Sequence, residues 1–145
     1  MRFNDFDALY DYLIDVTEGP FDENFGDLPE MIRNLHVVAI FTMEIMNGGL
    51  CQFFVNNGEE YASLVSDALI AVGLDKVAAM YNAFLSDSGI SMSDMESFEI
   101  DGIDEFEEQT ERYPFDDFDD AFYELSESLD MEQAMLDYAN AHAAD

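Results

Sequence analysis

The sequence predicts an all-α fold, a compact single-domain bundle of six to eight helices. Apolar residues recur at spacings of three and four along most of the 145-residue chain. No stretch shows the alternation with turn signals that is typical of β-strands. Nearly half of the residues, 49%, are hydrophobic, which is enough apolar material for a folded core. We expect one domain over residues 1–145, with a motif-bearing core at 35–86 and acidic flanking helices at 1–30 and 91–145.

The first two helices are expected on either side of a loop rich in Gly and Pro. Asn4 can cap the first helix, whose apolar face carries Phe6, Leu9, Leu13 and Val16. The loop covers residues 17–30, and Pro29 suits the first turn of the next helix. That helix, over about 30–46, is largely apolar and therefore central.

Residues 47–49 should end that helix, and a short apolar segment over 50–55 follows before a second break at residues 56–58. Two further helices are expected over about 60–72 and 74–86, separated by Gly73. Their apolar faces carry Tyr61, Leu64, Val65, Ala68, Leu69 and Val72 on the first, and Leu74, Val77, Ala78, Tyr81, Phe84 and Leu85 on the second. Residues 87–103 read as a connector. Helices then resume near Asp104 and, after a stop at Pro114, near Phe115, and the last covers about 131–141.

The charge of the chain restricts its partners. Thirty-four acidic residues face four basic ones, giving a net charge of −30. Such a chain repels nucleic acid and anionic lipid, and it attracts basic proteins and cations. The acids are concentrated at the two ends: residues 1–30 hold nine, 31–90 hold six and 91–145 hold nineteen. If the two ends pack side by side, their acids form a single surface.

The remaining bulk features predict a cytoplasmic protein with no membrane contact. One cysteine, Cys51, excludes an intrachain disulfide and suits a reducing compartment. Acids occupy the N-terminal stretch, where a signal peptide needs an apolar run. The longest apolar stretch, residues 35–46, is too short to span a membrane.

The stretch EIMNGGLCQFFVNNG is the most specific local signal. Two adjacent glycines inside an apolar helical run cost about 1 kcal/mol each relative to Ala, so they indicate a sharp turn with close backbone approach. We expect a structural motif made of Glu44, Asn47, Gly48, Gly49, Gln52, Phe53, Phe54 and Asn56. Gln52 and Asn56 lie four residues apart, which leaves open a binding role for their amides.

This motif resembles a bacterial family of small helical proteins best known for its DNA-mimic members. The family signature is Glu-x-x-Asn-Gly-Gly followed by Gln-Phe-Phe and Asn, as in the residues just given. The resemblance covers residues 35–86 well and 116–142 loosely. It implies an all-α fold, a DNA-binding protein such as a transcription regulator as the partner, and a possible homodimer.

Acids on ordered helices can imitate a duplex. Acids four residues apart stand about 6 Å apart along one helix face, and two such rows approach the charge density of double-stranded DNA. Aromatic rings at Phe106, Phe115, Phe118 and Phe122 are expected to anchor short helices to the core. The expected partner-binding residues are Asp7, Asp11, Asp15, Glu105, Glu107, Glu108, Glu111, Asp116, Asp117, Asp119, Asp120 and Glu124.

Other functions have weaker support in the sequence. Residues 97–108 resemble an EF-hand calcium loop with Gly102 in place, but Ser97 and Asp104 depart from the pattern. An acidic helical domain that binds calcium or other cations weakly is therefore one alternative. Cys51, His36 and His142 are too scattered for a zinc site, and His36 reads as a core histidine. We expect no enzymatic activity, no catalytic residue and no cofactor. An immunity or antitoxin protein that blocks a basic toxin or nuclease would use the same charge and remains an alternative.

Overall fold

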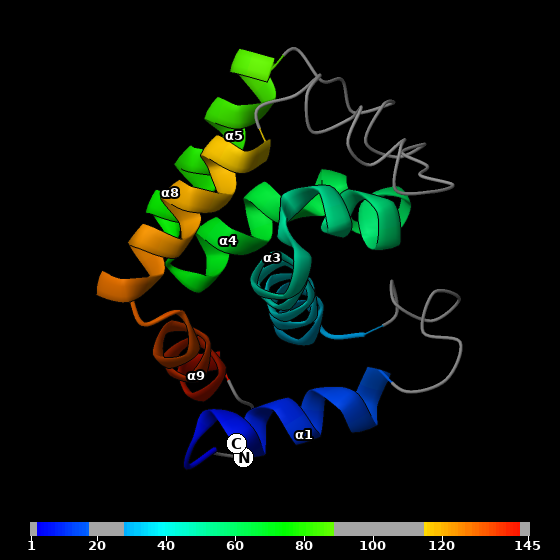
Figure 1. Cartoon of the computed structure of the whole chain (residues 1–145). Coiled ribbons are helices and arrows are strands. Elements are labelled where there is room, and N and C mark those ends of the chain that lie inside the picture. Colours follow the sequence, from blue (N-terminus) through cyan, green and yellow to red (C-terminus); the bar gives the residue numbers. More distant parts are fainter. Residues whose placement is uncertain (1–2, 18–27, 89–114, 143–145) are drawn as a thin grey trace.

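The helices of the protein pack around one long central helix, α3. The computed structural model describes residues 3–17, 28–88 and 115–142, and within these ranges it has six α-helices and no strand (Figure 1). The helices are α1 (Phe6–Thr17), α3 (Glu30–Tyr61), α4 (Val65–Val72), α5 (Asp75–Ser88), α8 (Phe115–Ser128) and α9 (Met131–His142), with a 3₁₀ turn η2 (Ala62–Leu64). The predicted all-α class is confirmed.

Helix α3 is longer than the sequence suggested. Its first part was expected to end at residues 47–49, and a kink there confirms that break. The second break, expected at residues 56–58, is absent, and the helix continues to Tyr61. A kink at Gly49, with φ 89° and ψ 175°, divides it into two helical parts. The second expected break is wrong because Phe53, Phe54 and Tyr61 are all buried. Their packing outweighs the weak local preference of Asn and Gly for a turn.

The apolar part of α3 also exceeds the stretch identified in the sequence. Residues Glu30–Phe54 form a helix long and apolar enough to cross a membrane by length and composition. An 18-residue apolar window of this stretch is 61% buried against the rest of the protein. That burial is what the central helix of a folded core requires, and the kink at Gly49 lies within the same stretch.

Aromatic rings hold α5 and α8 to α3 and to each other. The Phe41 ring packs edge-on against Tyr81 of α5 and Phe122 of α8, with centroid separations of 5.5 and 6.3 Å. The Phe84 ring of α5 stacks on Phe115 of α8 at 5.3 Å. Edge-on and offset ring pairs add about 0.5–1.5 kcal/mol each to the burial of their area. Helices α5 and α8 therefore lie side by side on the same side of α3 (Figure 1).

The boundary between α4 and α5 lies at Gly73, where the sequence predicted it, and most of the predicted apolar faces are buried. Gly73 ends α4 in the left-handed conformation, φ 91°, as a helix-terminating glycine does. All residues expected on the two apolar faces are buried except Leu64, which is 40% exposed, and Leu85, which is half-buried. Leu64 lies in the 3₁₀ turn, whose three residues per turn shift the helical register.

The first and last described segments of the chain are in contact, which is the condition stated above for a single acidic surface. The backbone N–H of Phe3 donates to Asn140 Oδ1 at 2.8 Å, and Asn140 Nδ2 donates to the Phe3 carbonyl at 3.0 Å. Helix α1 packs against α9, and the two helix axes cross (Figure 1). Asp5 rather than Asn4 caps α1, because its carboxylate accepts from the Ala8 N–H at 2.9 Å.

Candidate functional site: an acidic surface fastened to a kinked helix

The two glycines of the motif make room for two polar side chains. A Cβ at Gly48 would collide with the side chain of Gln52. Gln52 folds back over Gly48, and its amide donates to Glu44 Oε2 at 3.2 Å. A Cβ at Gly49 would collide with the carboxylate of Asp119 from α8. The signature residues thus form the kink of α3 and the surface that Asp119 of α8 contacts.

Two side chains of α8 complete the hydrogen bonding of the kink. A helix leaves N–H groups without acceptors at its start and carbonyls without donors at its end. Asp119 Oδ1 accepts from the N–H of Leu50, the first residue after the kink, at 2.9 Å. The Tyr123 hydroxyl donates to the carbonyl of Ile45, in the last turn before the kink, at 2.8 Å. Helix α8 is therefore fixed to both halves of α3.

The apolar face of α8 explains why its other face can carry acids. Phe115, Phe118 and Phe122 are at most 5% exposed, so the expected ring anchors within the described residues are confirmed. Phe106 lies outside those residues. Asp116 and Asp120 are exposed four residues apart, a spacing at which like charges destabilise an isolated helix. Burial of the rings therefore stabilises α8 against the repulsion between its own acidic side chains.

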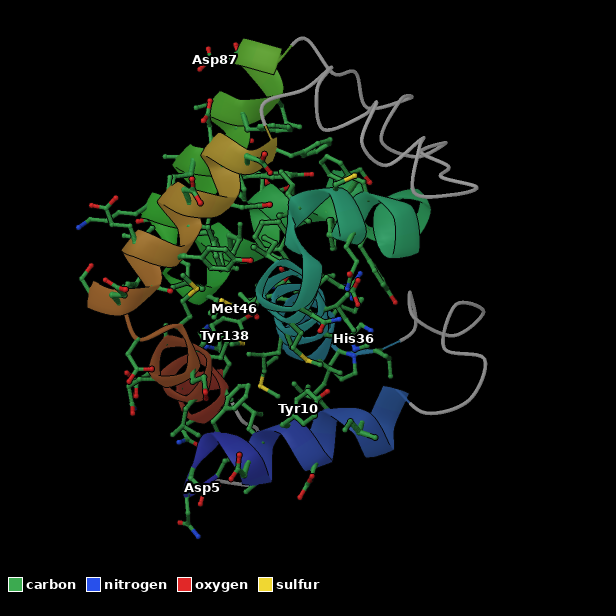
Figure 2. The ribbon with its side chains drawn as sticks, in the orientation of Figure 1. Asp5, Tyr10, His36, Met46, Asp87 and Tyr138 are labelled. Carbon is green, nitrogen blue, oxygen red and sulfur yellow. The ribbon has the colours of Figure 1, made fainter. Side chains whose placement is uncertain are left out.

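Exposed acids lie on α8 and also on α9 and α1. We call this set the acidic surface: Asp116, Asp117, Asp120, Glu124 and Glu127 of α8, Asp130, Glu132 and Asp137 at and along α9, and Asp5, Asp7 and Asp11 at and along α1. Figure 2 shows Asp5 pointing away from the protein at the start of α1. The sequences of these three helices contain no Lys or Arg. Other exposed acids in the described residues are fewer and lie apart on α3, α4 and α5: Glu30, Asp67, Asp75 and Asp87.

The expected partner-binding residues divide into three groups. Those that lie exposed on α1 and α8 are Asp7, Asp11, Asp116, Asp117, Asp120 and Glu124. Those outside the described part of the chain are Glu105, Glu107, Glu108 and Glu111, together with the side chain of Asp15. The side chain of Asn56, a residue of the structural motif, is also outside it. Asp119 forms the third group alone, because it is half-buried with its carboxylate turned onto Gly49 and Leu50.

Sequence reasoning missed the acids that continue the surface toward α9. Glu127 lies three residues after Glu124 on α8, so a spacing argument could have found it. Asp130 caps α9, where its carboxylate accepts from the Gln133 N–H at 3.0 Å. Asp130 therefore serves helix capping and also adds charge to the surface.

Burial alters the acid–base behaviour of three groups beside the kink and in the core. Desolvation raises the pKa of Asp119, and the neighbouring carboxylates of Asp116 and Asp120 raise it further, whereas the hydrogen bond from Leu50 lowers it. Burial and the negative charge of Asp119 raise the pKa of Cys51 to about 12, which makes this thiol a poor nucleophile. Burial lowers the pKa of His36, whose Nε2 lies 3.2 Å from the Tyr61 hydroxyl.

Metal chemistry has no candidate site in the part of the chain that the structure describes. No group of three or more His, Cys, Asp or Glu side chains there is arranged to hold a metal ion. The EF-hand-like residues 97–108 lie outside that part. His36 is buried in the core as expected, and His142 is exposed at the end of α9.

Comparison with known proteins gives one match. A family model described as DMP19-like protein matches residues 26–142, which is most of the chain. None of the curated proteins and none of the solved structures matches. The matched region includes the kink of α3 and all of α8 and α9.

Proposed function

Because the chain belongs to the DMP19-like protein family, we propose that it binds a basic, DNA-binding protein and competes with that protein's DNA. The observation that carries the proposal is the acidic surface, whose exposed acids lie on three helices without Lys or Arg. Helix α1 packs against α9, and α9 follows α8 directly in the chain. A protein that binds DNA through Lys and Arg gains much of its affinity by neutralising phosphates. Ordered carboxylates offer the same groups an alternative partner.

Order is what distinguishes this surface from a solvated acidic tail. A disordered acidic segment loses conformational entropy when it binds, which lowers its affinity. Helix α8 is already held by three buried rings and by the hydrogen bonds to Leu50 and Ile45. Asp116, Asp120 and Glu124 follow one another by four residues, which is about 6 Å of helix axis each. Two phosphate steps along one DNA strand cover a similar length.

The proposed action is competition by binding, without turnover, cofactor or direct contact with nucleic acid or membrane, in the cytoplasm. A homodimer would lengthen the acidic surface. An inhibitor of a basic toxin or nuclease remains a second candidate because it would use the same surface. The two differ in the partner's own activity, which a DNA-binding assay or a nuclease assay on the recovered partner distinguishes.

The test compares two triple variants that remove equal charge from different places. D116N/D117N/D120N removes three charges from the acidic surface and keeps Asp119 with its hydrogen bond from Leu50. The matched control D67N/D75N/D87N removes three exposed acids from α4 and α5. The partner is recovered from native lysate by pull-down at low salt, identified, and titrated with each variant after circular dichroism has shown intact helicity.

We expect the first variant to bind the partner about 10- to 100-fold more weakly and the control to bind nearly as wild type, since each lost contact is worth about 0.5–1 kcal/mol. The partner's DNA should displace the protein. Equal losses in both variants, or a ternary complex with DNA, would overturn the proposal. The contact should also weaken steeply as salt rises, as for DNA.

A further inference from the structure

A groove lined by methionines opens beside the acidic surface, where α1, α3 and the α8–α9 junction meet. Its volume is about 520 Å³, and its apolar lining includes Met43 and Met46 of α3, Met131 and Met135 of α9, Phe6 of α1 and Leu129. Figure 2 shows Met46 between α3 and the helices α8 and α9. We call this feature the methionine groove.

Two of the four methionines of the groove are open to solvent, whereas Met131 and Met135 are buried. Met43 is 46% exposed and Met46 is 57% exposed, although both lie on the central helix. Methionine has a long unbranched side chain that adapts to different partners, and it is common at surfaces that bind apolar anchors. A cavity of this size is also in the range that holds one or two large side chains.

The polar part of the lining is acidic. Glu127, Asp130 and Glu132 border the groove, and no Lys or Arg of residues 3–17, 28–88 and 115–142 lines it. The neutral hydroxyls are turned to the backbone: Ser126 Oγ donates to the Tyr123 carbonyl at 2.7 Å, and Thr42 Oγ1 donates to the Val38 carbonyl at 3.0 Å. The groove therefore presents an apolar floor with a negatively charged border.

We infer that the methionine groove docks a basic amphipathic helix of the partner protein, whose apolar side chains enter the groove while its Lys and Arg meet the border. Charge complementarity decides among occupants. A second copy of this chain would bring −30 of charge against an acidic border, and anionic ligands are repelled in the same way. Docking of an apolar helix face in a groove is a recurrent mode of recognition. The inference rests on the proposed function, because it gives the same basic partner a second point of contact that is not electrostatic.

The test uses two peptides of leucine and lysine, of equal composition and about five helical turns. One orders its residues as an amphipathic helix, and the other is scrambled. Binding to the full chain is followed by fluorescence anisotropy at low and raised salt. The protein variants are M43Q/M46Q, which keeps side-chain length, and the control L64Q/I70Q, which removes two exposed apolar residues elsewhere. If M43Q/M46Q loses helicity, M46Q replaces it.

We expect the amphipathic peptide to bind at least about tenfold more tightly than the scrambled one, as burial of apolar side chains predicts. The difference should persist at raised salt, disappear in M43Q/M46Q and remain in L64Q/I70Q. Equal binding of both peptides, an unaffected M43Q/M46Q, or a dimer that M43Q/M46Q dissociates in sedimentation would overturn the inference. The proposed function would still stand in those cases if D116N/D117N/D120N weakens partner binding, and absence of binding by either peptide would count against both.

Discussion

The carboxylate of Asp119 accepts a hydrogen bond of 2.9 Å from the backbone N–H of Leu50, 69 residues earlier in the chain and directly after the kink at Gly49. This contact joins the signature motif to the helix that carries much of the acidic surface. Asp119 sits among Asp116, Asp117 and Asp120 in the sequence, yet it is the acid of this group that turns inward. The motif in α3 and the helix α8 are thus connected directly by a hydrogen bond.

Removal of the Asp119 carboxylate should destabilise the fold. In D119A the Leu50 N–H loses its acceptor in a partly buried place, which we expect to lower the free energy of unfolding by about 1–3 kcal/mol. D119N keeps an acceptor oxygen and should cost clearly less. Urea unfolding followed by circular dichroism measures both. A D119A variant as stable as wild type would show that the contact contributes little.

The two glycines should respond differently to alanine. Gly49 has φ 89° and ψ 175°, a conformation that is essentially restricted to glycine, so G49A should cost about 1–3 kcal/mol and displace the Asp119 carboxylate. Gly48 lies in helical backbone and would meet the movable end of Gln52. G48A should therefore be nearly neutral, since helix propensity offsets the Gln52–Glu44 hydrogen bond. Equal costs for both variants in urea unfolding would contradict this account of the kink.

Stability should depend on pH through Asp119. Its pKa is raised in the folded protein, so the folded state binds the proton more tightly than the unfolded state. The resulting stabilisation is fully present below the unfolded pKa and is lost as pH rises through the folded pKa. His36, with its lowered pKa, acts in the opposite direction and loses stability as pH falls. The free energy of unfolding of wild type minus that of D119N therefore isolates the Asp119 contribution. Measured at several pH values from about 4 to 8, this difference should decline as pH rises.

Cys51 should be inert in the folded protein. It is 1% exposed, and burial together with Asp119 raises its pKa to about 12. A thiol-specific reagent should react fully in denaturant and on the timescale of unfolding without it. Fast labelling of the native protein would contradict the burial of this thiol.

The sequence predicted most of the helices because their apolar faces follow the helical period. The ends of α5 and α9, the role of Gly73 and the ring anchors of α8 all follow from spacing and local turn chemistry. It failed at residues 56–58, where an Asn-Gly stop signal is overridden by the buried residues around it. It also placed the cap of α1 at Asn4, one residue before Asp5, since both side chains can cap a helix.

The sequence by itself determined the helical class, the net charge of −30 and the need for glycine at a sharp turn in the central helix. Each of these depends on composition or on residues close together in the chain. The tertiary structure alone decided that Asp119 turns inward, that the acid-bearing helices α1 and α9 pack together, and that four methionines from two helices line one groove. Helical periodicity shows which face is polar, but the neighbour that this face meets is set by packing between segments distant in the chain.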